Sequence, residues 1–166
     1  MVRGQGDVTV TLSVLDRLID WEPKNQVEAP LSRAQSVRVM KNAVRRDLEW
    51  LLNSRSVAFE PDEALREVNR SLYVYGLPDF SSYAAASAAD QAKLLREIMG
   101  AIKLFEPRLA DVRIIPVEVP GSGLKEFKLR IEALLRMDPS PEPVSFDTVI
   151  ELKSGVCRIS GGANAG

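Results

Sequence analysis

The stretch Ile102-Lys103-Leu104-Phe105-Glu106-Pro107-Arg108-Leu109 decides the fold, because the chain changes from helical to extended periodicity across it. Before it, apolar residues recur at spacings of three and four, which predicts an amphipathic helix. Pro107 disfavours helical dihedral angles at Glu106 and so ends this helix. After it, apolar and polar residues alternate, which predicts half-buried strands. The segment therefore separates a helical part of the chain from a sheet.

Two long helices are predicted before this boundary. The first extends from Ser32 to about Ser54, because its apolar residues form one stripe. The stripe consists of Val37, Met40, Val44, Leu48, Leu51 and Leu52. The second begins with the capping pattern Ser87-Ala88-Ala89-Asp90 and ends at Pro107. Both helices therefore present an apolar face to a core.

Strands are predicted after the boundary. Residues 127–135 and 144–152 alternate between apolar and polar side chains, as half-buried antiparallel strands do. A strand over residues 112–119 precedes them, and residues 156–159 are expected to form a short fourth strand. Pro116 cannot donate to a ladder, so its strand should lie at an edge or carry a bulge. The prediction is an α+β fold, with N-terminal helices packed on one face of a C-terminal antiparallel sheet of three to four strands.

The length and composition indicate one globular domain. The chain has 166 residues, of which 45% are hydrophobic and 27% charged, as in ordinary soluble proteins with a core. The domain is expected over residues 31–160. Residues 1–30 are expected to form an N-terminal arm and linker, and the Gly- and Ala-rich residues 161–166 a flexible tail.

Charge and missing residue types argue against several function classes. Lys and Arg number 22 against 23 Asp and Glu, so no basic field favours nucleic acid. There is no histidine, the usual general base and zinc ligand, and the single Cys157 excludes a multi-thiolate metal site. No cofactor or metal is expected. The sequence shows neither the apolar stretch of a signal peptide nor a membrane span, so we expect a cytoplasmic protein without membrane insertion.

The end of the second helix carries the most conspicuous charges. The Glu106 carboxylate lies near the negative end of the helix dipole and should need a positive partner. Arg108 is the nearest candidate, because a planar guanidinium can hold a carboxylate with two parallel hydrogen bonds. The corner Glu106-Pro107-Arg108 either locks a turn or presents a docking surface. The residues alone leave both interpretations open.

The first helix has a basic face opposite its apolar stripe. This face carries Arg38, Lys41, Arg45 and Arg46. In a nearly neutral protein such a face is by default exposed to solvent. Contact with a partner is the alternative, and Arg45 and Arg46 are the candidate residues for it.

Five blocks of the sequence, in order, together resemble a known family. They are Ser13-Val14-Leu15-Asp16-Arg17-Leu18, Val44-Arg45-Arg46-Asp47-Leu48-Glu49-Trp50-Leu51-Leu52-Asn53, Tyr75-Gly76-Leu77-Pro78-Asp79, Phe105-Glu106-Pro107-Arg108-Leu109, and the stretch from Phe127 through Phe146-Asp147-Thr148. The chain is similar to the TssE family of type VI secretion system baseplate subunits, which belongs to the lysozyme-like wedge proteins of contractile phage tails.

The resemblance implies a non-enzymatic, cytoplasmic assembly component. It implies docking to a core bundle of the baseplate subunits TssF and TssG, with TssK as a further candidate partner, and a sheet that templates the contractile sheath of TssB and TssC. On this pattern Glu106, Pro107 and Arg108 form the docking corner. Because sheet edges accept added strands, we expect residues 125–153 to offer an open edge to the sheath.

Two other function classes remain as alternatives. The lysozyme-like label suggests a peptidoglycan-cleaving glycosidase, which needs two carboxylates, one of them kept protonated. Candidate carboxylates are those of Glu49, Glu106, Glu118 and Glu132, although none has a sequence context that marks an acid and a nucleophile. A peptide-binding adaptor unrelated to secretion would also suit a basic helix and an open sheet.

Overall fold

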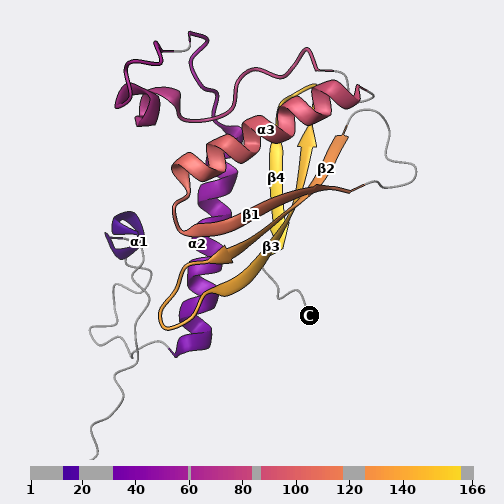
Figure 1. The fold of residues 1–166 in the computed structure, drawn as a ribbon. Helices are drawn as coiled ribbons and strands as arrows, with labels where there is room; N and C mark the ends of the chain where they lie inside the picture. Colours follow the sequence, from indigo (N-terminus) through magenta and orange to yellow (C-terminus); the bar gives the residue numbers. More distant parts are fainter. Residues whose placement is uncertain (1–12, 19–31, 60, 84–86, 118–125, 162–166) are drawn as a thin grey trace, which may run out of the picture.

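The computed structural model describes residues 13–18, 32–59, 61–83, 87–117 and 126–161, and it has an α+β fold (Figure 1). In chain order the elements are α1 (Val14–Leu18), α2 (Arg33–Asn53), the 3₁₀ turns η1 (Val68–Arg70) and η2 (Leu72–Val74), α3 (Ala88–Phe105), β1 (Leu109–Pro116), β2 (Glu126–Leu135), β3 (Glu142–Glu151) and β4 (Cys157–Gly161). The helices precede the four strands, which confirms the predicted fold class.

The two long helices begin and end at the predicted signals. Ser32 caps α2 with a capping box that includes Gln35, and Ser87 caps α3 by accepting a hydrogen bond from the Asp90 N–H. At the other end of α3, Glu106 has φ −122° and ψ 69°, outside the helical region, as expected before proline. Local chemistry therefore sets the limits of both helices.

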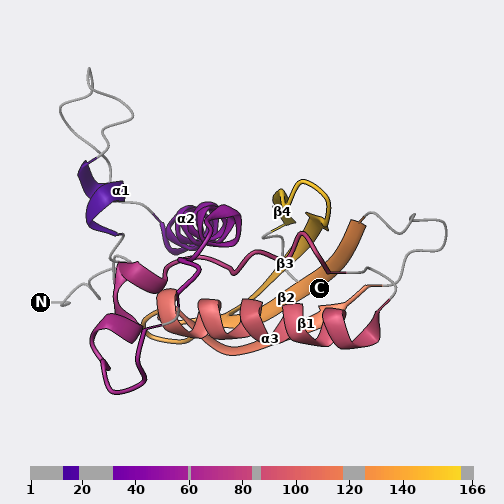
Figure 2. The ribbon, with the colours of Figure 1, turned by 90° about the horizontal axis from the view of Figure 1, so that it is seen from above.

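The strands form an antiparallel meander in the order β1-β2-β3-β4. Alternate side chains of β2 and β3 are buried, which places one face of the sheet against the helices. Figure 2 views α2 nearly end-on while α3 extends across the view, so the two helices cross one another. They share one core with the sheet. Its largest fully buried side chains are Phe80, Phe146, Leu48, Leu52, Leu77, Leu94, Ile98, Ile102, Leu129, Ile131, Leu135 and Ile150.

The edges of the sheet differ from the prediction. β2 and β3 each pair with a strand on both sides, so the expectation that residues 125–153 offer an open edge is wrong. In a meander the middle strands are internal, and the edges belong to β1 and β4. β1 begins at Leu109 rather than at 112, and Pro116 ends it, in agreement with the predicted edge position.

β1 also carries the bulge that edge strands often have. Its register with β2 shifts between Ala110 and Arg113, and Asp111 between them has a φ of 50°. A non-glycine residue with positive φ is uncommon, and aspartate is among those that tolerate it best. The bulge divides β1 into a short first part and a regular part before Pro116.

The ends of the expected domain are described only in part. Of residues 1–30 the structure describes Ser13 to Leu18, and α1 contacts α2 through its Asp16. Gly161, which the prediction assigns to the tail, pairs with Phe146 as the last residue of β4. Residues 162–166 lie outside the described part of the chain.

Candidate functional site

The corner after α3 is held by a bidentate ion pair. Arg108 Nε donates to Glu106 Oε1 at 2.6 Å, and Arg108 Nη2 donates to Glu106 Oε2. The Glu106 side chain is only 4% exposed and that of Arg108 is 24% exposed. The expectation that Glu106 takes Arg108 as its cation is thus confirmed, and the fork geometry fixes the guanidinium plane.

A residue that the sequence reasoning did not single out joins the corner to α2. Arg108 Nη2 also donates to Asp47 Oδ2 at 2.7 Å. The other oxygen of this carboxylate, Asp47 Oδ1, accepts from Arg46 Nε at 2.9 Å and from Arg46 Nη2 at 2.7 Å. Asp47 therefore bridges two arginines that lie 62 positions apart in the sequence. Its place beside Arg46 in the second sequence block was the only signal that could have pointed to it.

The chain of charges continues from α2 to α1. Arg46 Nη1 donates to Asp16 Oδ1 at 2.6 Å, and the Ser13 hydroxyl donates to Asp16 Oδ2 at 2.6 Å. We call the linked side chains of Asp16, Arg46, Asp47, Arg108 and Glu106 the corner network. It contains three carboxylates and two guanidinium groups, which leaves one negative charge. It joins α1, α2 and the α3–β1 corner.

The pKa values agree with strong pairing in the corner network. Burial alone would lower the pKa of Arg108, but the hydrogen bonds to Glu106 and Asp47 outweigh it and raise that pKa. Burial would likewise raise the pKa of Asp16, yet the hydrogen bonds from Arg46 and Ser13 leave it lowered. The hydrogen bond to Asp16 raises the pKa of Arg46. Arg108, Asp16 and Arg46 are therefore charged together over the physiological range.

Arg45 lies elsewhere, at the outer edge of β4. Arg45 Nη1 donates to the Ile159 carbonyl at 3.4 Å and lies 3.6 Å from the Glu49 carboxylate. The structure thus separates the two predicted arginines, since Arg46 belongs to the corner network and Arg45 to the β4 edge.

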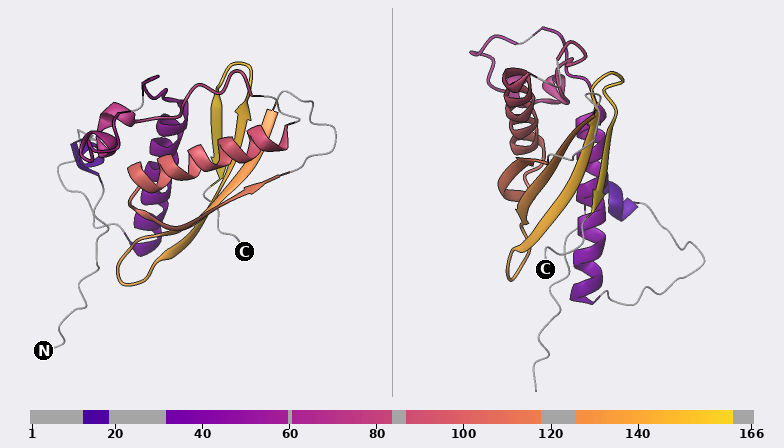
Figure 3. Two further views of the ribbon diagram at one scale, coloured as in Figure 1. Left: turned by 45° about the horizontal axis from the view of Figure 1, so that its top comes forward. Right: turned by 90° about the vertical axis from the view of Figure 1, so that its right-hand side faces the viewer.

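The β4 edge is closed by side chains of α2. The Asn53 amide accepts from the Cys157 N–H and donates to the Cys157 carbonyl, both at 2.8 Å. An amide that pairs with both backbone groups of one residue replaces the neighbouring strand that this edge lacks. Figure 3 shows α2 running beside β4 in its right-hand view. Burial raises the pKa of the Cys157 thiol to about 12, which keeps it protonated and unreactive.

The expected solvated basic face of α2 is only partly correct. Arg38 is exposed, but the Lys41 side chain is 5% exposed and lies 3.9 Å from the Glu142 carboxylate. The expectation is wrong for Lys41 because this part of α2 packs toward the start of β3, where Glu142 supplies a counter-charge.

The comparison with protein families identifies what kind of protein carries this corner. The family model of baseplate wedge protein gp25 matches residues 38–140, which is more than half of the chain. The chain belongs to the gp25 baseplate wedge family. No curated protein and no solved structure shows a significant match.

The match covers most of the candidate docking site of this wedge protein. It includes the part of α2 with Arg46 and Asp47, all of α3, and the corner Glu106-Pro107-Arg108. α1, β3 and β4 lie outside the matched residues. Membership in the wedge family gives the chain a structural role in a baseplate.

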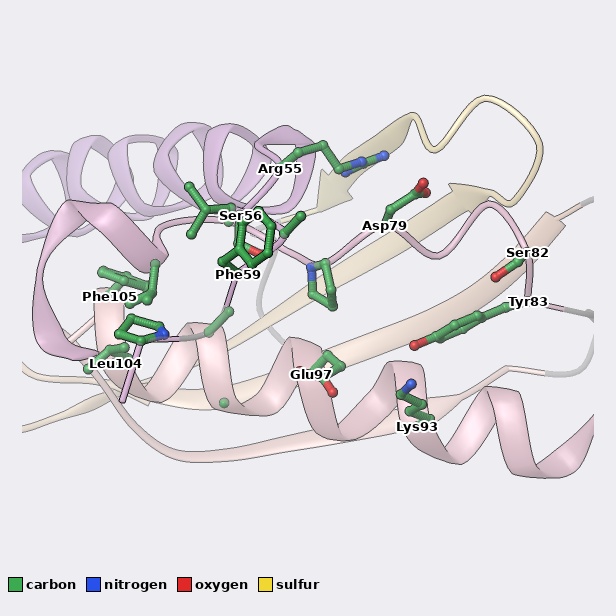
Figure 4. Close-up of a pocket in the computed structure, with 18 residues that line it drawn as sticks. Arg55, Ser56, Phe59, Asp79, Ser82, Tyr83, Lys93, Glu97, Leu104 and Phe105 are labelled. Atoms are coloured by element: carbon green, nitrogen blue, oxygen red, sulfur yellow. The ribbon is translucent and has the colours of Figure 1, made fainter. Parts of the chain in front are cut away.

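The wedge protein also has a groove between α3 and the segment that precedes it. The groove has a volume of about 930 Å³ and is lined by Phe59, which is 83% exposed, and by Leu104 (Figure 4). Two of its cations already have partners: Arg55 donates to the Gly155 carbonyl at 2.9 Å, and Lys93 lies 5.2 Å from the Tyr83 ring centre. The groove therefore offers apolar contact area beside cations that are already engaged.

The candidate glycosidase carboxylates do not form an acid and nucleophile pair of the expected kind. Glu49 is paired with Arg45 and Glu106 with Arg108, whereas a glycosidase acid needs an apolar pocket. Glu132 lies on β2, on the face away from the core, and Glu118 lies outside the described residues. Among the described residues no group of three His, Cys, Asp or Glu could hold a metal ion. None of the described helices is both long enough and apolar enough for a membrane span.

Proposed function

We propose that the chain is a non-enzymatic component of a type VI secretion system baseplate wedge that acts in the cytoplasm. It docks to the TssF/TssG core bundle, with TssK as a further partner of the assembled wedge, and its sheet templates the TssB/TssC sheath. Family membership and the five sequence blocks support this assignment. The observation that carries it is the family match over residues 38–140, which includes the corner where Arg108 remains partly exposed.

A guanidinium held in this way suits docking. Arg108 does not have to lose side-chain freedom on binding, because Glu106 and Asp47 already fix it. A partner that covers the corner would also remove water from ion pairs that are partly exposed, which strengthens them. Arg46 belongs to the same network and is part of the proposed docking surface, whereas Arg45 is assigned to the closed β4 edge.

The docking proposal is tested with Arg108→Lys, which keeps the charge and loses the fork. Binding to purified TssF/TssG should weaken at least about tenfold, as expected when a buried charge pair of an interface is perturbed. Arg130→Lys is the matched control, because Arg130 also pairs with an aspartate at 2.7 Å but lies on the sheet. Equal binding of both variants and the unsubstituted protein would contradict docking through the corner.

The proposed sheath-templating surface is the β1 edge. The Val117 N–H donates to the Lys128 carbonyl at 2.9 Å, and hydrogen bonds alternate along an antiparallel ladder. The backbone N–H and C=O groups of Ile115 and Arg113 therefore point toward β2, and those of Ile114 point away from it, toward the open edge. A sheath strand would add beside this regular part of β1, between the bulge and Pro116.

Hydrogen exchange tests the sheath proposal. On addition of TssB/TssC, the Ile114 amide should become protected from exchange, because a new strand would accept its hydrogen bond. The Cys157 amide should not change, since Asn53 already accepts from it. Unchanged exchange across β1, or new protection confined to β4, would contradict this surface. The purified chain is also expected to leave peptidoglycan intact in a zymogram.

A further inference from the structure

Asp47 occupies the centre of the corner network. It is the residue that contacts both guanidinium groups, Arg108 through Oδ2 and Arg46 through Oδ1. Its side chain is 23% exposed, so it is enclosed by these contacts and still reaches the surface. The Glu106-Pro107-Arg108 corner alone would hold Arg108 by a residue two positions away on the same turn. Asp47 adds a contact from a different element.

We infer that Asp47 is the positioning residue of the docking corner, which orients Arg108 for the partner and ties α1 and Arg46 into the same surface. This inference rests on the proposed docking function. Asp47 acts through Arg108, and the partner contact remains with Arg108.

The geometry gives the reason. Arg108 uses Nε and Nη2 on Glu106, and Nη2 also on Asp47. Glu106 follows the last turn of α3, whereas Asp47 lies in the middle of α2, which is anchored in the core by Val44 and Leu48 on either side. The backbone of the corner is already fixed, since the Arg136 N–H donates to the Arg108 carbonyl at 2.8 Å and the Leu109 N–H donates to the Glu106 carbonyl at 3.1 Å. Asp47 therefore adds a second fixed point for the Arg108 guanidinium itself.

The same carboxylate extends the surface toward α1. Arg46 contacts Asp47 and Asp16, and its guanidinium carbon lies 4.9 Å from the centre of the Trp50 ring, a side chain that is 52% exposed. Tryptophan and arginine are the residue types that most often dominate binding energy at interfaces. Because the guanidinium of Arg108 carries only N–H donors, backbone carbonyl or carboxylate oxygens on the partner would complement it.

The test uses the full chain and purified TssF/TssG, with the affinity of Asp47→Asn, Arg108→Lys and the double variant measured. Asp47→Asn should weaken binding about tenfold, and in the Arg108→Lys background it should add less than about twofold, because residues that act as one unit are not additive. Asp147→Asn, which removes a matched aspartate from Arg130, is the control and should stay within about twofold.

The outcomes separate the docking function of Arg108 from the positioning role of Asp47. If Arg108→Lys binds normally, the docking function itself fails. If Arg108→Lys is weakened and Asp47→Asn is not, docking stands and the role of Asp47 is overturned. Full additivity of the two changes would also overturn it, because two residues that act on the partner as one unit are not additive.

A second variant covers the case in which Asp47→Asn does not fold. Asp47→Glu keeps the negative charge and moves the carboxylate by one methylene. A positioning role predicts that Asp47→Glu still weakens binding by several-fold, because geometry matters more than charge here. Unchanged affinity of Asp47→Glu would overturn the inference.

Discussion

Arg108 and Arg130 make hydrogen bonds of the same length to an aspartate, yet their surroundings differ. Both N–O distances are 2.7 Å. The Arg108 and Asp47 side chains are 24% and 23% exposed, against 46% and 55% for Arg130 and Asp147. Arg108 also holds the nearly buried Glu106, whereas Arg130 lies on the solvent face of the sheet. Distance alone therefore says little about what an ion pair contributes, and burial and connectivity decide it.

The largest difference between the two sites is expected from Arg108→Ala. Removing this guanidinium leaves the Glu106 carboxylate almost fully buried without its cation, so the free energy of unfolding should fall by about 3 kcal/mol. Arg130→Ala should leave it within experimental error. Urea unfolding of both variants measures the two changes in the free energy of unfolding. Equal losses would mean that burial does not separate the two pairs.

A smaller loss is expected from Asp47→Asn. The amide keeps one acceptor oxygen, but the charge-assisted bonds to Arg108 and Arg46 are weakened, which should cost about 1 to 2 kcal/mol of unfolding free energy. Asp147→Asn serves as the control and should unfold like the unsubstituted protein. If the two aspartates prove equivalent in denaturant, the network adds nothing to the single pair.

The contact between α1 and α2 through Asp16 should make the stability of the protein sensitive to acid. The folded-state pKa of Asp16 lies below its ordinary value of 3.8, so the unfolded state binds its proton first as the pH falls. The stability that Asp16 contributes is thus present above pH 3.8 and lost as the pH drops through the lower, folded-state value. Asp16→Asn should flatten the acid limb of the stability curve, measured by unfolding between about pH 5 and pH 3. An unaltered acid limb would argue against the Asp16–Arg46 pair.

Added salt should give the smallest and most selective effect. Raising the salt concentration to about 1 M screens exposed charges strongly and partly buried ones less. The coupling between Arg130 and Asp147, measured by a double-mutant cycle, should vanish, while that between Arg108 and Asp47 should persist. Loss of both couplings at the same salt concentration would mean that the ion pairs of the corner network are as exposed to solvent as the Arg130–Asp147 pair.

The sequence predicted the fold to the extent that local chemistry decides it. Ser32 and Ser87 mark the helix starts, Pro107 marks the end of α3, and strict alternation identifies β2 and β3. These signals act between residues that are near in the chain. The pairing of Glu106 with Arg108 was predictable for the same reason.

Contacts across the fold could not be predicted in this way. Asp47 reaches Arg108 over 61 positions, and Asp16 reaches Arg46 over 30, so both depend on how α1, α2 and the corner pack. The burial of Lys41 depends on Glu142 in the same manner. The open edge was misplaced because alternation shows that a strand is half-buried and does not show which neighbours it pairs with.

The side-chain amide of Asn53, which pairs with the backbone of Cys157, makes the two edges of the sheet unlike each other. At one edge Cys157 is capped by a side chain, and at the other edge β1 has β2 as its one strand neighbour on the described part of the chain. Under the proposed sheath role, strands would add at β1 and not at β4, so growth from this domain would run in a single direction.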